Sequence, residues 1–241
     1  MLKKIRFILM ILISFSLFSC GEEKKKAGFD ENATKDLFIA SKIENLRLAK
    51  KAIANNANVN SVDKKGLTPL MASVKNESVR TDVAEFLVNK GADIKVNDSE
   101  DNTILHIALM KKKFNLARLL IEKGADATAV NKKNETPVYL TIKMNKLELL
   151  KMLIEKGIDV KSIEKTGKTP LIMAIYNRNY KMIRLLIDRG IGINAQEPDG
   201  TTALHAAVHS NLYWVVKLLI RHKADLNIKN KRGKAPMYYA K

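Results

Sequence analysis

Apolar residues recur with helical spacing over most of the chain, in pairs of short segments. One segment of each pair is short, as in ILHIALM at residues 104–110, and the other is longer, as in LARLLIEKG at residues 116–124. The glycine that closes the longer segment suits a helix C-cap, because glycine adopts a positive φ without steric cost. Each pair therefore predicts a unit made of a turn, a first helix, a second helix and a loop.

These units repeat along the chain. Threonines in similar contexts are separated by 35, 33, 33 and 33 residues, and they are Thr68, Thr103, Thr136, Thr169 and Thr202. The glycines that follow the longer segments are each 33 residues apart, and they are Gly91, Gly124, Gly157 and Gly190. A period near 33 indicates stacked units that share a continuous core.

The first twenty residues have a different pattern, typical of an export signal. Lys3, Lys4 and Arg6 precede an uncharged apolar run at residues 7–18, which is shorter than the ~20 apolar residues that span a bilayer. The run ends in Leu17-Phe18-Ser19-Cys20, which resembles the lipobox of bacterial lipoproteins, although Phe18 is bulkier than the usual residue at its position. In that family the cysteine becomes the N-terminus after cleavage and carries the lipid. Alternatively, Cys20 ends an ordinary signal peptide or is a buried thiol.

Cys20 is the only cysteine, so no disulfide forms within the chain and packing alone must stabilise it. The segment that follows is charged and poor in apolar residues, which predicts a flexible tether. We therefore expect a signal peptide at residues 1–19, a lipidated cysteine and tether at 20–33, and a folded domain at 34–241.

The repeated units resemble the ankyrin repeat, whose signature is T-P-L-H-x-A followed by an L-L-x-x-G-A-D run. The matching stretches are TPLMAS from Thr68, TILHIA from Thr103, TPVYLT from Thr136, TPLIMA from Thr169 and TALHAA from Thr202. Degenerate units, KDLFIA from Lys35 and KAPMYYAK from Lys234, flank these five clear repeats. The resemblance implies an all-α solenoid of paired antiparallel helices with β-turn fingers, and it covers residues 34–241.

The departures from the pattern also lead to predictions. The second unit carries a two-residue insertion between its helices, near NESVRTD. Asn134 replaces a turn glycine and tolerates its conformation, whereas Lys223 replaces a cap glycine and should weaken the last complete unit locally. We expect Tyr238, Tyr239 and Lys241 to cap the C-terminal end.

The chain offers little for catalysis or metal binding. His205 and His209 share a helix face, but the residue after the first is Ala206 rather than the glutamate of a zinc peptidase. His106 and His205 instead occupy the histidine position of the repeat, which forms hydrogen bonds between turns. No phosphate-binding loop or nucleophile motif is present, so we expect neither an enzyme nor a cofactor nor a metal.

The resemblance implies that partners dock on the concave face, formed by the turn tips and by residues seven and eight after each threonine. These positions include Lys75, Met110, Lys111, Lys143, Met144, Tyr176, Asn177 and His209. Met and Tyr inside a rim of lysines suit the core of a protein interface. Alternatively, these side chains pack against the neighbouring helix or are merely exposed.

Trp214 is the only tryptophan, at a position that is polar in the other units. It is either a second contact residue or a shield for the C-terminal half unit.

Charge narrows the choice of partner. Loss of the signal peptide lowers the net charge from +18 to about +15. Basic residues cluster at the predicted turn tips, at Lys64, Lys65, Lys132, Lys133, Lys165, Lys168, Lys231, Arg232 and Lys234, and the run at Lys111–Lys113 adds to them. Such a surface attracts acidic proteins, anionic lipids or sulfated sugars. Nucleic acid is disfavoured because aromatic residues are not interleaved with the basic tips.

The sequence therefore predicts a monomeric, non-catalytic binding module for an acidic protein, anchored by lipid at Cys20 in the bacterial envelope, on the periplasmic side or the cell surface. The alternative is an electrostatic adhesin that binds anionic polymers or membranes.

Overall fold

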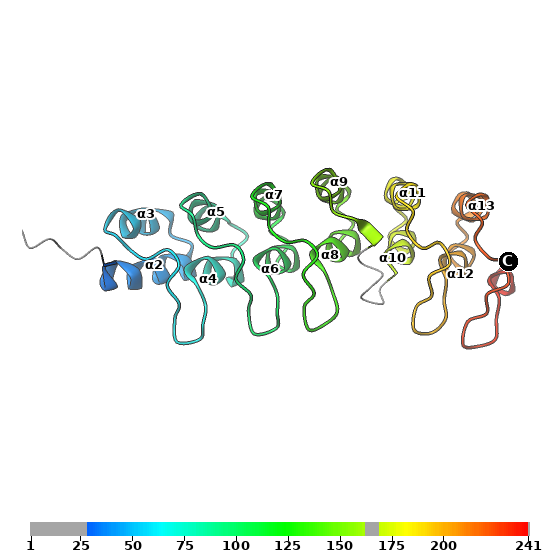
Figure 1. The fold of residues 1–241 in the computed structure, drawn as a ribbon, viewed down its shortest axis with the longest axis horizontal. Coiled ribbons are helices and arrows are strands. Elements are labelled where there is room, and N and C mark those ends of the chain that lie inside the picture. Colours follow the sequence, from blue (N-terminus) through cyan, green and yellow to red (C-terminus); the bar gives the residue numbers. More distant parts are fainter. Residues whose placement is uncertain (1–27, 162–168, 241) are drawn as a thin grey trace, which may run out of the picture.

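The computed structural model describes residues 28–161 and 169–240, which form an elongated array of helix pairs (Figure 1). Within these residues the regular structure is helical apart from two isolated β-bridges, Asn97 with Thr103 and Gln196 with Thr202. The predicted all-α solenoid is confirmed. The signal peptide, Cys20, Lys165 and Lys168 lie outside the described residues.

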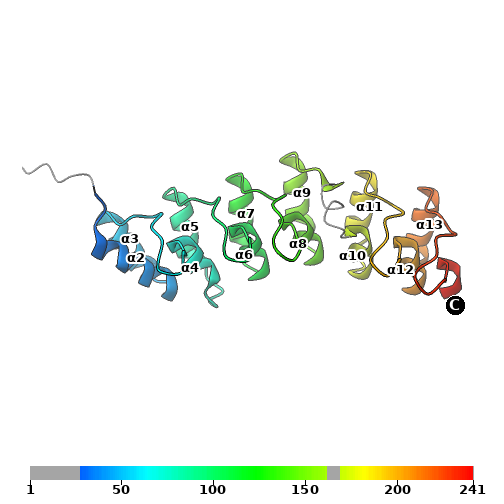
Figure 2. The ribbon, with the colours of Figure 1, turned by 60° about the horizontal axis from the view of Figure 1, so that its bottom comes forward.

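The helices form two parallel rows, and the fingers project from one side of the array (Figures 1 and 2). The inner row, next to the fingers, consists of α2 (Glu31–Ile43), α4 (Pro69–Lys75), α6 (Ile104–Met110), α8 (Pro137–Lys143), α10 (Pro170–Tyr176) and α12 (Ala203–His209). The outer row consists of α3 (Leu46–Ala54), α5 (Asp82–Asn89), α7 (Phe114–Glu122), α9 (Leu147–Glu155), α11 (Tyr180–Asp188) and α13 (Tyr213–Arg221). A 3₁₀ helix, η2 (Pro236–Tyr239), closes the array.

Each inner helix from α4 onwards begins after a threonine of the repeat signature. The hydroxyl groups of Thr68, Thr103, Thr136 and Thr202 accept a hydrogen bond from the backbone N–H three residues later, at 3.1–3.4 Å. Such N-caps satisfy a donor that would otherwise have no partner. Thr169 differs, because its hydroxyl donates to the Glu197 carboxylate at 2.7 Å.

The core runs continuously between the two rows. The inner helices are buried on nearly all sides, and Leu105, Leu140 and Ala174 lie in this layer with at most 2% of their surface exposed. The outer helices bury one face, such as Leu116 and Leu120 of α7. The inner helices therefore form most of the contacts between neighbouring units. The last residue of each inner helix from α4 onwards is at least partly exposed.

Neighbouring fingers contact each other through their backbones. The Lys231 N–H donates to the Asp199 carbonyl at 2.8 Å, and the Lys132 N–H donates to the Glu100 carbonyl at 3.1 Å. Gly200 has φ +82, and a Cβ there would lie 2.8 Å from the Asn230 Cα. A glycine is thus required at this turn by both its conformation and the close approach of the next finger.

The folded part begins earlier than the predicted boundary at residue 34. Helix α2 starts at Glu31, because the Asp30 side chain accepts a hydrogen bond from the Ala33 N–H at 2.7 Å and serves as N-cap. Ala33 is already part of the core, with 5% of its surface exposed.

The insertion in the second unit lies between its helices, as predicted, at residues 76–81. A polar network crosses three units next to it: the Glu44 carboxylate accepts from the Asn76 amide and the Val83 N–H, both at 3.0 Å.

Lys113 Nζ donates to the Asn76 amide oxygen at 2.9 Å and to the Ser73 carbonyl at 3.1 Å. Lys113 is only 4% exposed. Its assignment to the exposed basic surface was wrong, because its ammonium group joins adjacent repeats instead.

Tyr239 packs against the C-terminal end of the array, as predicted. Its ring lies 6.2 Å from that of His205 and 5.9 Å from that of His209, and its hydroxyl accepts from the Asn230 amide at 2.9 Å. Tyr238 is largely exposed and contacts Tyr239 edge-on. Lys241 lies outside the described residues.

Replacing Lys223 with glycine is expected to raise the free energy of unfolding by about 1 kcal/mol. Lys223 has φ +63 at the position where the other clear repeats have glycine, and a non-glycine residue is strained there. Gly124→Lys is the matched control: a Cβ at Gly124 meets no atom within 4 Å, so this change introduces only the backbone strain. Urea denaturation should show opposite shifts for the two variants; equal shifts would contradict this account.

Candidate binding surface

Apart from Trp214, the predicted contact residues lie in order along the finger side of the inner helix row, which is called the concave side below. One row consists of the last residues of successive inner helices, and these are Lys75, Met110, Lys143, Tyr176 and His209. The residue after each helix forms a second row, which includes Lys111, Met144 and Asn177. The repeat thus positions one side chain of each row per unit.

The three lysines of this surface are paired with carboxylates of the same array. Lys75 Nζ lies 2.9 Å from Asp98, Lys143 Nζ lies 2.8 Å from Glu135, and Lys111 pairs with Glu77. Burial alone would raise the pKa of Asp98, but hydrogen bonds from Lys75 and Asn102 hold it below its ordinary value. The hydrogen bond that Lys143 donates to the Glu135 carboxylate raises the pKa of Lys143. These pairs reduce the positive field that the lysines alone would create.

The two methionines do not form one continuous stripe. Met110 ends its helix, whereas Met144 follows its helix, so the two side chains belong to different rows. Both are half-buried and pack against the core. Much of the surface of both methionines is therefore packed against neighbouring helices, as the alternative interpretation expects.

Asn177 has a structural contact between repeats. Its amide donates to the Ile142 carbonyl at 3.0 Å, at the end of the preceding inner helix. Asn76, at the equivalent position of the second unit, donates to the Ser41 carbonyl at 3.2 Å in the same way. Asparagine in this row satisfies helix-end carbonyls that would otherwise lack a partner.

Tyr176 and His209 come together at the C-terminal half of the concave side. They line a cavity of about 180 Å³ that also includes Asp199, Arg232 and Tyr239. Tyr176 is 52% exposed, and burial together with Glu197 and Asp199 raises its pKa. With His205, which also lines it, the cavity combines four aromatic rings with the side chains of Asp199 and Arg232. Tyr239 was predicted only as a cap.

Trp214 lies in the outer row, away from this cavity. Its ring meets Tyr180 of α11 edge-on, with 5.6 Å between ring centroids, and 44% of its surface is exposed. It thus packs towards the preceding repeat. The interpretation as a shield for the C-terminal half unit was wrong: η2 packs on α12 instead.

His106 and His205 have the structural role that the repeat pattern predicts. His106 Nε2 lies 3.0 Å from the Glu135 carbonyl, and Nδ1 lies 3.1 Å from the Thr103 nitrogen and 2.9 Å from its hydroxyl oxygen. His205 joins Thr202 to the Lys234 carbonyl in the same way. Within the described residues no group of three or more potential metal ligands occurs.

Stability is expected to fall when the pH drops below about 6.5, because burial lowers the pKa of His106 despite its bond to Glu135. Below that pH the unfolded chain binds more protons than the folded chain, so protonation favours unfolding, by up to about 1.4 kcal/mol per pH unit. Well above pH 6.5, His106 is neutral in both the folded and the unfolded chain, so it does not lower the free energy of unfolding there. Urea denaturation between about pH 7.5 and pH 5.5 measures this slope. If His106→Ala leaves the slope of unfolding free energy against pH unchanged, His106 is not the source of the pH dependence.

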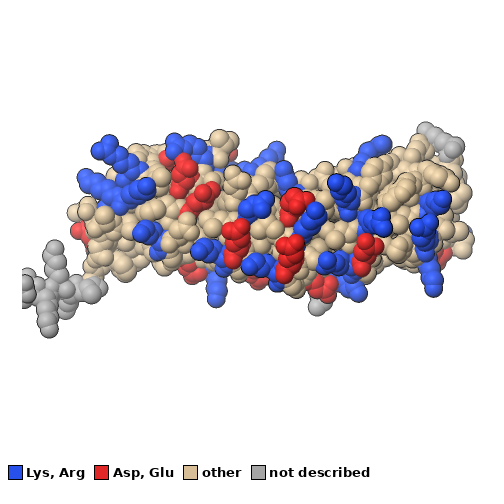
Figure 3. Space-filling model, turned by 90° about the horizontal axis from the view of Figure 1, so that it is seen from above, with Lys and Arg blue, Asp and Glu red and all other residues tan. Residues whose placement is uncertain are grey.

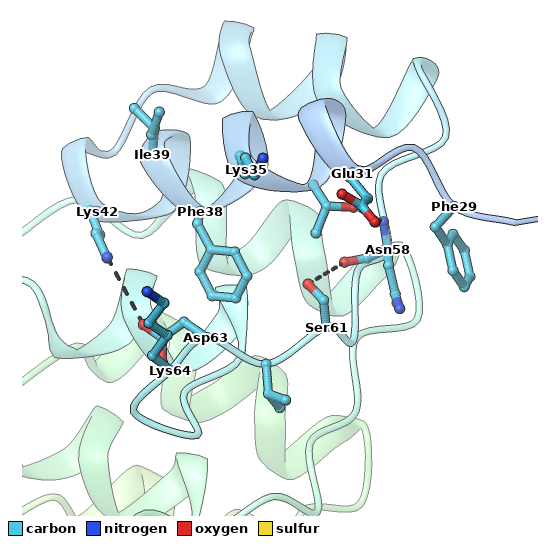
Figure 4. Close-up of a pocket in the computed structure, with 12 residues that line it drawn as sticks. Phe29, Glu31, Lys35, Phe38, Ile39, Lys42, Asn58, Ser61, Asp63 and Lys64 are labelled. Atoms are coloured by element: carbon cyan, nitrogen blue, oxygen red, sulfur yellow. Dashed lines mark hydrogen bonds and ion pairs between the residues drawn. The ribbon is translucent and has the colours of Figure 1, made fainter.

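A second concavity, which the sequence did not predict, lies at the N-terminal end of the array. A groove of about 760 Å³ lies between α2 and the first finger, and its apolar lining consists of Phe29, Phe38, Ile39 and Val62 (Figure 4). Phe29 lies in the segment predicted as a tether, and the first unit departs from the repeat signature, so the sequence predicts no binding surface there. Ile39 occupies a position that is apolar in every clear repeat, so no signal in the sequence indicated that it is exposed here.

The outer face carries both signs of charge. Figure 3 views this face and shows acidic side chains between the Lys and Arg side chains along the array. Two ion pairs on this face each form within a single helix: Lys151 pairs with Glu148 in α9, and Arg184 pairs with Asp188 in α11. The exposed basic residues of the finger tips lie on the opposite side, as predicted, and they are Lys64, Lys65, Lys132, Lys133, Lys231 and Arg232.

A family model described as ankyrin repeats (3 copies) matches residues 37–131, 124–197, 142–230 and 190–241. The chain belongs to the ankyrin-repeat family. Members of this family are generally non-catalytic modules that bind other proteins. A search of curated proteins finds no match. Among the described residues, no helix is long and apolar enough to cross a bilayer.

Solved ankyrin-repeat structures resemble this one over most of its length. The ankyrin repeat domain of Bcl-3, described as a member of the IkappaB protein family, is 27% identical, with a TM-score of 0.66 over 86% of this chain and 93% of that one. The human ASB11 domain is 23% identical, with a TM-score of 0.64 over 85% and 91% of the two chains. A domain from Acinetobacter baumannii AYE is 24% identical, with a TM-score of 0.66 over 78% and 98%. The latter two are similar in fold.

Proposed function

We propose that this chain is a lipid-anchored ankyrin-repeat protein of the bacterial envelope, on the periplasmic side or the cell surface, which acts as a monomer and binds a protein partner on its concave side. The observation that carries this proposal is the convergence of Tyr176, His209 and Tyr239 around one concave cavity. Aromatic residues beside a charged rim are typical of the few positions that dominate protein interfaces.

The finger tips favour an acidic partner. Lys75, Lys111 and Lys143 already have carboxylate partners, so a ligand would have to compete for them. The exposed tip residues Lys133, Lys231 and Arg232 lie on the same side of the array and remain accessible. We therefore expect the tips to steer an acidic protein and the aromatic cavity to hold it.

The anchor is supported by the chain that precedes the fold. The basic start, the apolar run at 7–18 and Cys20 follow the order of a lipoprotein signal, and the fold begins only at Asp30. Acyl chains on Cys20 would hold the array at a membrane surface, more firmly than the marginal binding of a single chain.

Capture from an envelope extract tests the binding function. Residues 21–241, which contain every helix of the array, are immobilised, and retained material is eluted with increasing salt. At ~1 M salt the Debye length is about 3 Å, so contacts between surface charges are screened. We expect one protein to remain bound. A Tyr176→Ala/His209→Ala column should lose it, whereas Tyr213→Ala, at an exposed outer-row position, should retain it.

A second function, adhesion to a polyanion, is favoured by the exposed basic finger tips. It predicts that a mixture of anionic material elutes together at moderate salt, equally from all columns. That result would replace the first proposal.

A further inference from the structure

The N-terminal end of the array combines exposed apolar side chains with the point at which the chain enters the fold. Phe29 is 60% exposed, Ile39 50%, Ile43 61% and Val62 65%. Ile39 and Ile43 are one helical turn apart on α2, and Val62 lies on the finger beside it. Phe38 extends from α2 towards that finger (Figure 4). Apolar residues that are exposed singly are common, but a group of them rimmed by polar residues is typical of an interaction surface.

Lysines surround this patch. Lys35, Lys42 and Lys64 line the groove with it, and Lys65 is exposed on the adjacent turn. The acidic residues of the lining are Glu31 and Asp63. One Asp63 oxygen accepts hydrogen bonds from the Lys65 and Leu67 N–H groups of its own turn, at 2.9 and 3.0 Å, and the other lies 4.0 Å from Lys42. The excess charge of the patch is therefore positive.

The position of the patch indicates what covers it. Cys20 precedes Gly28, the first described residue, by eight residues. A chain of that length spans at most about 28 Å and about 16 Å on average if flexible. The Asn56 amide donates to the Gly28 carbonyl at 3.0 Å, and the Asp30 N–H donates to the Asn56 carbonyl at the same distance. The entering chain is thus attached to the end of the array that carries the patch.

We propose that this end of the array lies against an anionic lipid surface. Phe29, Ile39, Ile43 and Val62 enter the interfacial region, and Lys35, Lys42, Lys64 and Lys65 contact lipid phosphates. The inference rests on the proposed anchor at Cys20, which brings this end to the membrane. It leaves the Tyr176–His209 cavity, at the other end of the concave side, free for the partner.

Vesicle binding of the unlipidated chain tests the contact separately from the anchor. Residues 21–241 are sedimented with vesicles of equal parts phosphatidylglycerol and phosphatidylcholine. We expect binding that is weakened about tenfold by Phe29→Ala with Val62→Ser, on the loss of two apolar anchors. The control is Val79→Ser with Tyr213→Ala, which are 93% and 78% exposed at other sites and should have no effect. No binding by the unchanged chain would overturn the proposal.

Charge reversal distinguishes a local contact from overall charge. Lys35→Glu with Lys64→Glu should weaken vesicle binding about 30-fold, because each lysine near an anionic surface contributes to binding. Lys231→Glu with Arg232→Glu changes the net charge equally at the opposite end of the array. If both pairs weaken vesicle binding equally, the net charge of the chain and not this patch causes the binding, and the proposal is overturned.

The same variants test whether the groove docks a protein instead. If Phe29→Ala with Val62→Ser leaves vesicle binding unchanged but removes the captured protein from the column, the groove is a protein site and the proposal is wrong. Acyl labelling of Cys20 is measured independently, so failure of the anchor and failure of the lipid contact give different results.

Discussion

His106→Ala is expected to lower the free energy of unfolding by about 3 kcal/mol. The side chain is fully buried, and its ring joins the Thr103 cap to the Glu135 carbonyl of the next finger. Removal takes away the ring nitrogen that accepts from the buried Thr103 N–H and creates a cavity, and each effect is destabilising. Urea denaturation followed by circular dichroism measures the change.

Two other histidines provide the controls. His209 is exposed, so His209→Ala should change stability by less than about 0.5 kcal/mol. His205→Ala removes the equivalent bond, but to the terminal half unit, so it should destabilise less than His106→Ala. Equal effects of all three substitutions would contradict the role of His106 in coupling internal repeats.

Cys20→Ser is expected to abolish lipid anchoring and to leave only the reversible contact of the N-terminal patch with lipid. A serine has no thiol for the lipid, and within the described residues no helix can span a bilayer in its place. We expect incorporation of labelled fatty acid to disappear and the chain to move from the detergent phase to the aqueous phase on phase partitioning.

Matched chains separate lipidation from other membrane contacts. Ser19→Ala keeps a small residue before the cysteine and should be labelled as the unchanged chain is. A Cys20→Ser chain that remains in the detergent phase with an intact signal peptide would indicate an uncleaved apolar segment instead. Labelling of that chain would show that the acyl group is elsewhere.

The repeat architecture was predictable because its determinants are local. A threonine that caps a helix accepts from the N–H three residues later, and a glycine at a helix end adopts a positive φ. Both depend on a few consecutive residues, so their spacing revealed each unit. His106 was assigned correctly for the same reason, since its bond to Thr103 closes within one turn.

The contact surface was only partly predictable because it depends on pairs from different units. Lys75 meets Asp98 and Lys113 meets Ser73 across repeats, and neither pairing follows from a spacing in the sequence. The first helix also departs from the repeat signature, so the groove at Phe38 was not predictable from the repeat pattern. Its departure from the pattern marked an exposed surface rather than a lost repeat.

The most direct test of the account is the affinity of the captured protein for three forms of residues 21–241 at high salt: the unchanged chain, Tyr176→Ala/His209→Ala, and Val79→Ser/Tyr213→Ala. We expect the first pair to weaken binding at least about tenfold and the second pair to leave it unchanged. Equal dissociation constants for all three forms would show that the concave aromatic cavity does not hold the partner.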